Sequence, residues 1–420
     1  MITVKKEIKE RIEWINRGEV PNGYIKHKKL GIIPQKWTYG KFKNFINIKT
    51  GQVNPQEEPY CNMVHIGLAN IEKFTGRLLY VKTAQEENLI SGKYYFESGD
   101  VLFGKIRPEL SKVYTPKFEG ICSSDIYPLS PKNNIKSTFL KYLLLDKRFY
   151  KFSVSISART GLPKVNREDL GSYLALLPPI DEQEIIGSIL STWDNAIELK
   201  EKLIVQKKEQ KKGLMQNLLT GKVRLSGFND KWKPVKLGDV LKFKKKEALS
   251  NPQDYYLLTV KLHLKGIEAT NKKPNVTTKG RPYYLREPGE LLIGRQNFHN
   301  GGIGIVPKDM VEYIASNAIS SVETKKGNLK FYYYYLSNGN FYKRVGHIIG
   351  GTGQKEISES SMKKLKLIIP TSIEEQNAIT NILSTVDKEI KLLERELEEL
   401  KQQKKGLTQL LLTGKVRVKS

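Results

Sequence analysis

The chain has 420 residues, with 71 lysines and arginines against 44 aspartates and glutamates, giving a formal net charge of +27. This length fits two or three domains, and an aromatic content of 9% argues against a disordered chain. Two cysteines are too few for a disulfide framework or a four-thiolate metal site. No apolar run is long enough to span a membrane and the N-terminus does not resemble a signal peptide, so we expect a cytoplasmic protein. The positive charge favours a polyanionic partner, above all nucleic acid.

The N-terminal 36 residues predict a short charged helix followed by a turn at Pro21-Asn22-Gly23. Beyond these residues the sequence contains an internal repeat. Residues 181–224 and 374–417 align without a gap at an offset of 193, and both end in Leu-Leu-Thr-Gly-Lys-Val-Arg. Upstream, the run FESGDVLFGK at 96–105 matches REPGELLIGR at 286–295. The stretches 51–80 and 252–281 share little, so a common frame with different inserts predicts one task performed on two targets.

The repeated segments predict two long helices. Proline precedes each segment, glycine follows it, and apolar residues recur at intervals of three and four, as in a coiled coil. A helix over 182–218 would be about 55 Å long at about 1.5 Å per residue and needs a partner to cover its apolar stripe. We expect the two helices to pair with each other, although each could instead pack on its own domain. The predicted interface residues are Ile186, Leu190, Trp193, Ile197, Ile379, Leu383, Val386, Ile390, Leu393 and Leu397.

The segments before each helix predict mixed α/β domains. Short apolar runs at 101–103, 174–177 and 291–293 are bounded by glycine or proline, which is typical of buried strands. Residues 137–152 and 330–344 predict helices that cover a sheet. The predicted fold is therefore two mixed α/β modules separated by two long helices that pair as an antiparallel coiled coil, with an internal pseudo-two-fold duplication. The predicted segments are 1–36 (N-terminal helix and turn), 37–177 (module 1), 178–222 (central helix), 223–369 (module 2) and 370–420 (C-terminal helix).

The sequence contains no recognisable catalytic or metal-binding motif. A phosphate-binding G-x-x-x-x-G-K-[ST] loop is missing, and the five histidines lack metal-ligand spacing. Asp100 and Lys105 could be combined into a nuclease-like pair, but the second copy has Glu290 and Arg295 at these positions. We therefore predict no catalytic residue and no metal ligand in this chain.

Cations and amides follow equivalent predicted strands in both copies. Arginine, glutamine and asparagine can form bidentate hydrogen bonds with base edges in the major groove, and lysine binds phosphate. Each such side chain could also be an ordinary solvated surface residue, and the turns Thr160-Gly161 and Thr352-Gly353 could simply pack on the helices. The candidate DNA-binding residues are Lys105, Arg107, Arg159, Lys164, Arg295, Gln296, Asn297, His299 and Lys355.

These motifs resemble those of specificity subunits of type I restriction-modification systems. The resemblance lies in the Glu-Gln pairs that open both helices (Glu182-Gln183 and Glu375-Gln376), the repeated helix ends, the run GDVLFGKIRP at 99–108, and Gly31-Ile-Ile-Pro with Trp37. It implies that modules 1 and 2 are target recognition domains. It further implies that the helices dock two methyltransferase subunits, which use S-adenosylmethionine, and that two ATP- and Mg-dependent endonuclease subunits join them. This chain itself would bind no cofactor.

Antiparallel helices would present the two unlike modules in inverted orientation, matching the approximate two-fold symmetry of B-DNA. The expected target is therefore a bipartite, asymmetric DNA site with a fixed gap, whereas parallel pairing would remove the inversion. Two alternatives remain at this point. The chain could be the recognition subunit of another multi-subunit restriction or methylation enzyme, or a coiled-coil assembly protein whose basic surface is incidental.

Overall fold

A computed structural model describes residues 2–158, 163–275, 280–347 and 356–418. The chain forms two compact units, which we call unit 1 (Met1–Glu201 with Glu396–Ser420) and unit 2 (Lys202–Arg395). The helices α5 (Ile180–Leu218) and α10 (Ile373–Leu412) each contribute residues to both units. Each unit is therefore built from parts of both repeats, and the units do not coincide with the five segments predicted along the sequence.

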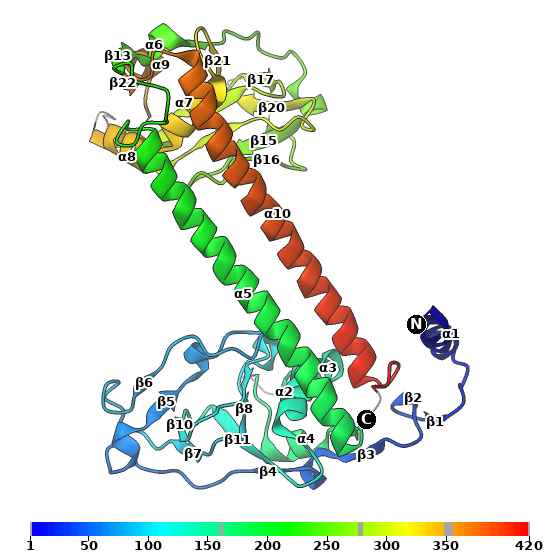
Figure 1. Ribbon diagram of the computed structural model, residues 1–420. Coiled ribbons are helices and arrows are strands. Elements are labelled where there is room, and N and C mark those ends of the chain that lie inside the picture. The colour runs from blue at the N-terminus through cyan, green and yellow to red at the C-terminus, as the bar shows by residue number, and fades with distance from the viewer. Residues whose placement is uncertain (1, 159–162, 276–279, 348–355, 419–420) are drawn as a thin grey trace. The chain divides into compact units, whose positions relative to one another are not determined.

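Unit 1 contains two four-stranded sheets and two strand pairs. The first sheet has the order β4-β11-β8-β9 and is antiparallel. The second has the order β6-β5-β10-β7 and is mixed, because β5 and β10 run parallel. Figure 1 shows α2 and α3 beside the first sheet. The strands are β1 (Tyr24–His27), β2 (Gly31–Pro34), β3 (Thr38–Lys41), β4 (Ile46–Ile48), β5 (Val64–Ile66), β6 (Lys82–Thr83), β7 (Tyr94–Phe96), β8 (Val101–Gly104), β9 (Val113–Tyr114), β10 (Gly120–Cys122), β11 (Ile126–Pro131) and β12 (Leu174–Leu177), and the short helices are α1 (Ile2–Arg17), α2 (Ser137–Leu145), α3 (Lys147–Ser157) and α4 (Arg167–Ser172).

Unit 2 repeats this topology. Its sheet β14-β21-β18-β19 corresponds to β4-β11-β8-β9, and its mixed sheet β16-β15-β20-β17 corresponds to β6-β5-β10-β7, again with one parallel pair. The pair β13-β22 corresponds to β3-β12. The elements are β13 (Lys233–Lys236), α6 (Leu237–Val240), β14 (Leu241–Phe243), β15 (Tyr256–Val260), β16 (Ile267–Ala269), β17 (Tyr283–Arg286), β18 (Leu291–Gly294), β19 (Ile303–Ile305), β20 (Tyr313–Ser316), β21 (Ile319–Thr324), α7 (Leu329–Ser337), α8 (Gly339–Tyr342), α9 (Glu359–Lys363) and β22 (Lys366–Ile369).

The buried strands predicted from the sequence are present as β8, β12 and β18. All four residues of β8 and of β18 are buried, as expected for a strand covered on both faces. The turn before β8 needs glycine, because Gly99 has φ of +91°, a conformation that costs other residues energy. Gly289 occupies the equivalent turn before β18, with φ of +86°.

The single helix predicted over 137–152 is wrong, because the segment is broken at Asp146. This residue has an extended backbone, with φ of −70° and ψ of 149°, and its carboxylate accepts a hydrogen bond from the backbone N–H of Arg148. A side chain that caps a new helix stabilises a break in this way. The segment predicted over 330–344 likewise divides at Asn338, between α7 and α8.

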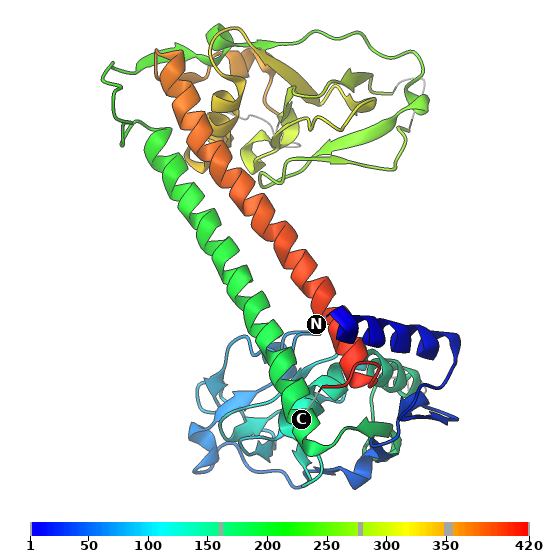
Figure 2. The same cartoon turned by 45° about the vertical axis from the view of Figure 1, so that its right-hand side comes forward.

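The end of each repeat packs into the core that contains the start of the other repeat's helix. Leu411 and Leu412 of α10 belong to the same core cluster as Ile186 and Leu190 of α5 in unit 1. In unit 2, Leu218 and Leu219 share a cluster with Ile379 and Leu383. A fully buried leucine contributes about 1.5–3 kcal/mol, so these contacts tie the repeats together strongly. Figure 2 shows α1 beside the C-terminal end of α10, where Lys415 contacts Asn16.

Ion pairs give the direction in which α5 and α10 run within each unit. In unit 1, Lys200 contacts Glu396 at 2.8 Å, and Asp194, earlier on α5, contacts Lys404, later on α10. In unit 2, Lys207 contacts Glu389 at 2.8 Å and Lys211 contacts Asp387 at 2.6 Å. Rising numbers on α5 pair with falling numbers on α10 in both units. The two helices are therefore antiparallel, as the sequence predicts.

The predicted interface residues fall into two groups. Trp193, Val386 and Leu393 are half-buried. The other seven are buried, with exposed fractions of 9% or less: Ile186, Leu190, Ile197, Ile379, Leu383, Ile390 and Leu397. The helices pack both on each other and on the modules, so the structure combines the two arrangements considered from the sequence.

Candidate nucleic-acid interface

The loop after β8 brings together two segments of unit 1 that are far apart in sequence. The backbone N–H of Lys105 donates to the carbonyl of Asp125 at 2.9 Å, and its carbonyl accepts from the N–H of Val165 at 2.8 Å. The N–H of Arg107 donates to the carbonyl of Pro163, and Ile106 forms a β-bridge with Lys164. We call this cluster of Lys105, Arg107 and Lys164 site 1.

Positive charge at and beside site 1 gathers over the ring of Tyr127. The Lys105 ammonium lies 5.0 Å from the centre of the Tyr127 ring, and the Arg167 guanidinium lies 4.7 Å from the same ring. Burial, and then the neighbouring charge of Lys164, lower the pKa of Lys105. Arg107 and Lys164 are exposed. Among the described residues, no carboxylate forms an ion pair with Lys105, Arg107 or Lys164, so this charge is available to a polyanion.

The loop after β18 forms the equivalent cluster in unit 2. The N–H of Arg295 donates to the carbonyl of Ala318 at 3.0 Å, and its carbonyl accepts from the N–H of Ile357 at 3.2 Å. Its guanidinium contacts the carboxylate of Glu356 at 2.8 Å. Gln296 and His299, in the short helix η6 (Arg295–Asn300), are half-buried. We call Arg295, Gln296 and Glu356 site 2.

The structure brings most of the predicted DNA-binding residues into these two sites. Arg159 and Lys355, with the turns Thr160-Gly161 and Thr352-Gly353, lie outside the described residues, as does the side chain of Asn297. Whether the remaining residues contact DNA stays a prediction.

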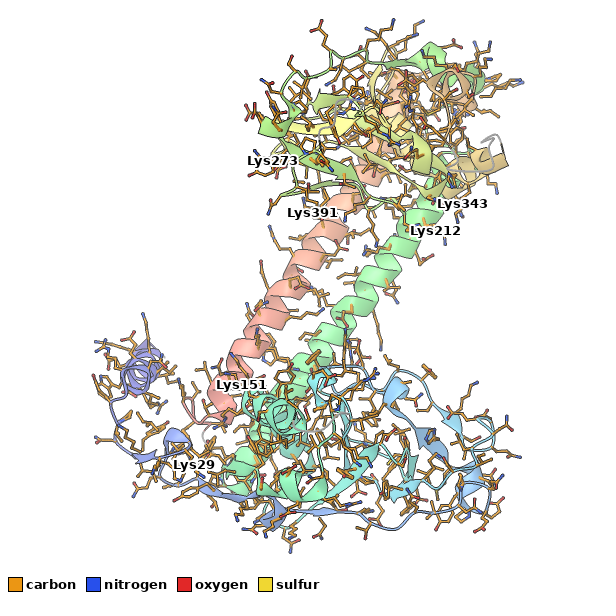
Figure 3. All side chains as sticks on the ribbon, turned by 180° about the vertical axis from the view of Figure 1, so that it is seen from behind. Lys29, Lys151, Lys212, Lys273, Lys343 and Lys391 are labelled. Atoms are coloured by element: carbon orange, nitrogen blue, oxygen red, sulfur yellow. The ribbon has the colours of Figure 1, made fainter. Side chains whose placement is uncertain are left out.

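The sequence reasoning missed one residue beside site 1, one residue of site 2, and a basic and aromatic pair elsewhere in unit 2. Arg167 donates to the carbonyls of Ile48 and Lys49 at 3.0 and 2.8 Å, and it stacks on Tyr127. Glu356 stands opposite Lys164 in the alignment of the repeats, and this change of charge could have singled it out. Another basic and aromatic pair lies in the variable part of unit 2, where Lys273 (labelled in Figure 3) lies 5.4 Å from the exposed ring of Tyr256.

Comparison with known proteins identifies the family. A family model described as "Type I restriction modification DNA specificity domain" matches residues 34–207 and, a second time, residues 229–402. The chain belongs to the specificity subunits of type I restriction-modification systems. Members of this family select the DNA sequence and leave catalysis to partner subunits.

One relative matches this specificity subunit over nearly its whole length, and another matches it over part of its length. It is 28% identical over 424 residues to the putative type I restriction enzyme MjaX specificity subunit of Methanocaldococcus jannaschii, covering 94% of this chain and 97% of the relative. It is 33% identical over 162 residues to the EcoDI specificity subunit of Escherichia coli, covering 39% of this chain and 36% of the relative.

Solved structures share the fold of this specificity subunit. One is a chain from work on complex assembly and conformational transition of the type I R-M system, with a TM-score of 0.56 and 16% identity, covering 91% of this chain and 99% of that chain. Another is the type I S subunit from M. genitalium, with a TM-score of 0.56 and 14% identity, covering 89% of this chain and 96% of that chain.

Asp100, which the sequence analysis considered as part of a nuclease-like pair, stabilises a turn in this specificity subunit. Its carboxylate contacts the Lys49 ammonium at 2.8 Å, accepts from the Ser130 hydroxyl at 2.7 Å and accepts from the N–H of Glu97 at 2.8 Å. Glu290 has the same kinds of partner in unit 2, among them Lys244 at 2.8 Å and Ser321 at 2.9 Å. These carboxylates hold the turns before β8 and β18, which explains why both copies carry an acid there.

The described residues were compared with the expectations for metal sites, membrane spans and cysteines. Within the described ranges, no group of three histidine, cysteine or acidic side chains is placed to hold a metal ion. In the same part of the specificity subunit, no helix combines the length and apolar content needed to cross a bilayer. Cys61 and Cys122 are free thiols, half-buried and buried respectively.

Proposed function

We propose that this specificity subunit recognises one bipartite, asymmetric DNA site, with site 1 contacting one half and site 2 the other. The observation that carries the proposal is the cluster of Lys105, Arg107 and Lys164. Two distant segments bring these cations together, and none of them forms an ion pair with a described carboxylate. Clustered like charges repel one another in the free protein, and DNA phosphates would relieve that repulsion.

The different composition of the two sites supports an asymmetric target. Site 1 contains three cations, whereas site 2 contains an arginine, a glutamine and a glutamate. Arginine suits guanine, glutamine suits adenine, and a carboxylate accepts from cytosine. Two sites of such different chemistry would not recognise the same half-site.

The proposed assembly contains two methyltransferase and two endonuclease subunits. Leu199 on α5 in unit 1 and Leu392 on α10 in unit 2 are equivalent positions, and both leucines are exposed, at 66% and 45%. Because the repeated helices present the same exposed side chain twice, one kind of partner would find two equivalent docking positions. S-adenosylmethionine, ATP and Mg would be bound by those partners and not by this chain, and the complex would act on DNA in the cytoplasm.

Exchange of one module tests the proposal. The specificity subunit is co-produced with its methyltransferase subunits, and the methylated adenines of the host DNA are mapped. Residues 252–363 are then replaced by the equivalent stretch of another specificity subunit. We expect one half of the methylated motif to change while the other half and the gap stay the same. A change in both halves, or in neither, would overturn the proposal.

A further inference from the structure

Sites 1 and 2 carry opposite charges at one pair of equivalent positions, and a second such pair lies beside them. The equivalence does not depend on sequence alignment, because the N–H of Val165 donates to the carbonyl of Lys105 just as the N–H of Ile357 donates to the carbonyl of Arg295. The residue before each donor is Lys164 in site 1 and Glu356 in site 2. Two residues after each donor, Arg167 in module 1 stands opposite Glu359 in module 2.

The charge of site 2 is therefore largely compensated. The guanidinium of Arg295 and the carboxylate of Glu356 are 2.8 Å apart, and their side chains are only 21% and 37% exposed. With its backbone hydrogen-bonded to Ala318 on one side and to Ile357 on the other, Arg295 is held at both its main chain and its side chain. One carboxylate oxygen of Glu359 accepts a hydrogen bond from the Ser320 hydroxyl at 2.6 Å.

These two arrangements favour different contacts with DNA. A free cation that neutralises a phosphate releases condensed counterions, so its contribution falls steeply with added salt. An arginine already paired with a carboxylate releases few counterions. A guanidinium held in one orientation is, however, suited to a base edge, where hydrogen-bond geometry decides affinity.

We propose that sites 1 and 2 contact DNA in different ways, each within its own half-site. Lys105, Arg107 and Lys164 of site 1 bind the phosphate backbone and supply salt-dependent affinity. In site 2, Glu356 is a positioning residue that neutralises Arg295 and orients it toward a base edge, so Arg295 supplies sequence discrimination within the half-site of module 2. The inference rests on the proposed function, because it assumes that both sites face DNA.

The experiment measures equilibrium binding of fluorescent duplexes to the complex of the specificity subunit with its methyltransferase subunits, at increasing KCl. One duplex carries the motif found by methylation mapping, and a second has a scrambled half-site for module 2. A plot of log K against log salt has a negative slope. The double variant K105A/K164A should make this slope less steep by about two, because each phosphate that is no longer neutralised reduces its steepness by roughly 0.9. Arg295→Ala should leave the slope unchanged but reduce discrimination between the two duplexes by roughly 5- to 150-fold.

Glu356→Gln distinguishes positioning from a merely structural role. It removes the carboxylate charge but keeps the side-chain shape, so we expect discrimination to fall as in Arg295→Ala. The slope should become steeper, by up to about one, because the freed guanidinium can bind phosphate. Glu323→Gln is the matched control, since Glu323 forms an exposed pair with Lys242 at 3.1 Å in the same unit, and both measurements should match the wild type.

The outcomes separate this inference from the proposed function. If Arg295→Ala abolishes discrimination but Glu356→Gln retains it, the positioning role is wrong and site 2 still contacts DNA. If Arg295→Ala makes the slope less steep by about 0.9, which is the change expected for loss of one phosphate contact, the different roles of the two sites are also overturned. If all these variants bind like the wild type, neither site faces DNA, and the proposed function fails as well.

Discussion

Arg417 of the second repeat donates two hydrogen bonds, at 2.6 and 2.7 Å, to the carboxylate of Glu182 in the first repeat. The indole N–H of Trp37 donates to the same carboxylate at 3.0 Å, and only 2% of the Glu182 side chain is exposed. Unit 2 repeats the arrangement, since Arg224 and Trp232 both donate to Glu375. This contact explains why both copies carry Trp, Glu and Arg at these equivalent positions.

Removing the Glu182 carboxylate should destabilise unit 1. Glu182→Gln leaves the Arg417 guanidinium without its ion-pair partner, and breaking a buried pair costs about 3–5 kcal/mol. We expect a clear fall in the urea midpoint followed by tryptophan fluorescence. Glu184→Gln is the control, because Glu184 is 56% exposed in its pair with Lys136, and such pairs contribute at most about 1 kcal/mol. Equal midpoints for the two variants would contradict the prediction.

A second repeated network should show energetic coupling. Tyr142 donates to Asp194 at 2.7 Å in unit 1, and Lys404 contacts the same carboxylate. Tyr334, Asp387 and Lys211 repeat these contacts in unit 2. In a double-mutant cycle, Tyr142→Phe and Asp194→Asn should therefore be coupled by about 0.5–3 kcal/mol.

The control for this cycle pairs Asp194→Asn with Tyr39→Phe. Tyr39 is 43% exposed, and no described contact joins its hydroxyl to Asp194. Coupling in this pair should be close to zero. The same cycle built on Tyr334 and Asp387 should reproduce the coupling measured in unit 1, and additive effects in both units would show that the network contributes nothing.

The stability of unit 2 should depend on pH through Glu290. Burial of Glu290 opposes its ionisation, but Lys244 and Lys246, at 2.8 and 2.7 Å, outweigh burial and lower its pKa to about 2. Because this value lies below about 4.3 in the unfolded chain, the stabilisation is complete above pH 4.3 and is lost as the pH falls toward 2.

Substitution isolates this contribution. We expect Glu290→Gln to lower the urea midpoint of unit 2 at pH 7, and the difference from the wild type to shrink between pH 4.3 and 2. Glu287→Gln is the control, because Glu287 contacts the same lysines but is 56% exposed. A constant difference between Glu290→Gln and the wild type at all pH values would show that Glu290 is not the titrating group.

The repeat itself made most of the fold predictable. The offset of 193 between Glu182 and Glu375, or between Asp194 and Asp387, identifies positions that make the same contacts, and the apolar spacing gives the helices. The break at Asp146 was missed because a cap is an interaction between neighbouring residues that helical periodicity does not reveal. The sequence did not predict that each compact unit contains parts of both repeats. The spacing of apolar residues shows that Leu411 is buried, but it does not show in which core Leu411 packs.

The candidate sites were predictable only in part. The clustering of cations after equivalent strands drew attention to Lys105 and Arg295. Arg167 was missed because its contact with Tyr127 depends on how a distant helix packs on the sheet, which a local pattern does not encode. Glu356 was aligned with Lys164, but a carboxylate is not an obvious DNA ligand, and only its 2.8 Å contact with Arg295 gives it a role.

Shortening both long helices should change the gap between the half-sites, if the helix pair sets their spacing as the sequence predicts. Residues 202–208 and 388–394 face each other in the antiparallel pair, since Lys207 contacts Glu389 at 2.8 Å. Deleting both stretches removes one heptad from each helix and keeps the apolar seam in register. At about 1.5 Å per residue this shortens the pair by about 10 Å, or roughly three base pairs at 3.4 Å each. Mapping methylated adenines should then give the same half-sites with a gap shorter by about three base pairs.

Deletion of 202–208 alone is the control and should abolish methylation, because the seam is then out of register. The same gap in the wild type and in the double deletion would show that the helices do not measure the spacing.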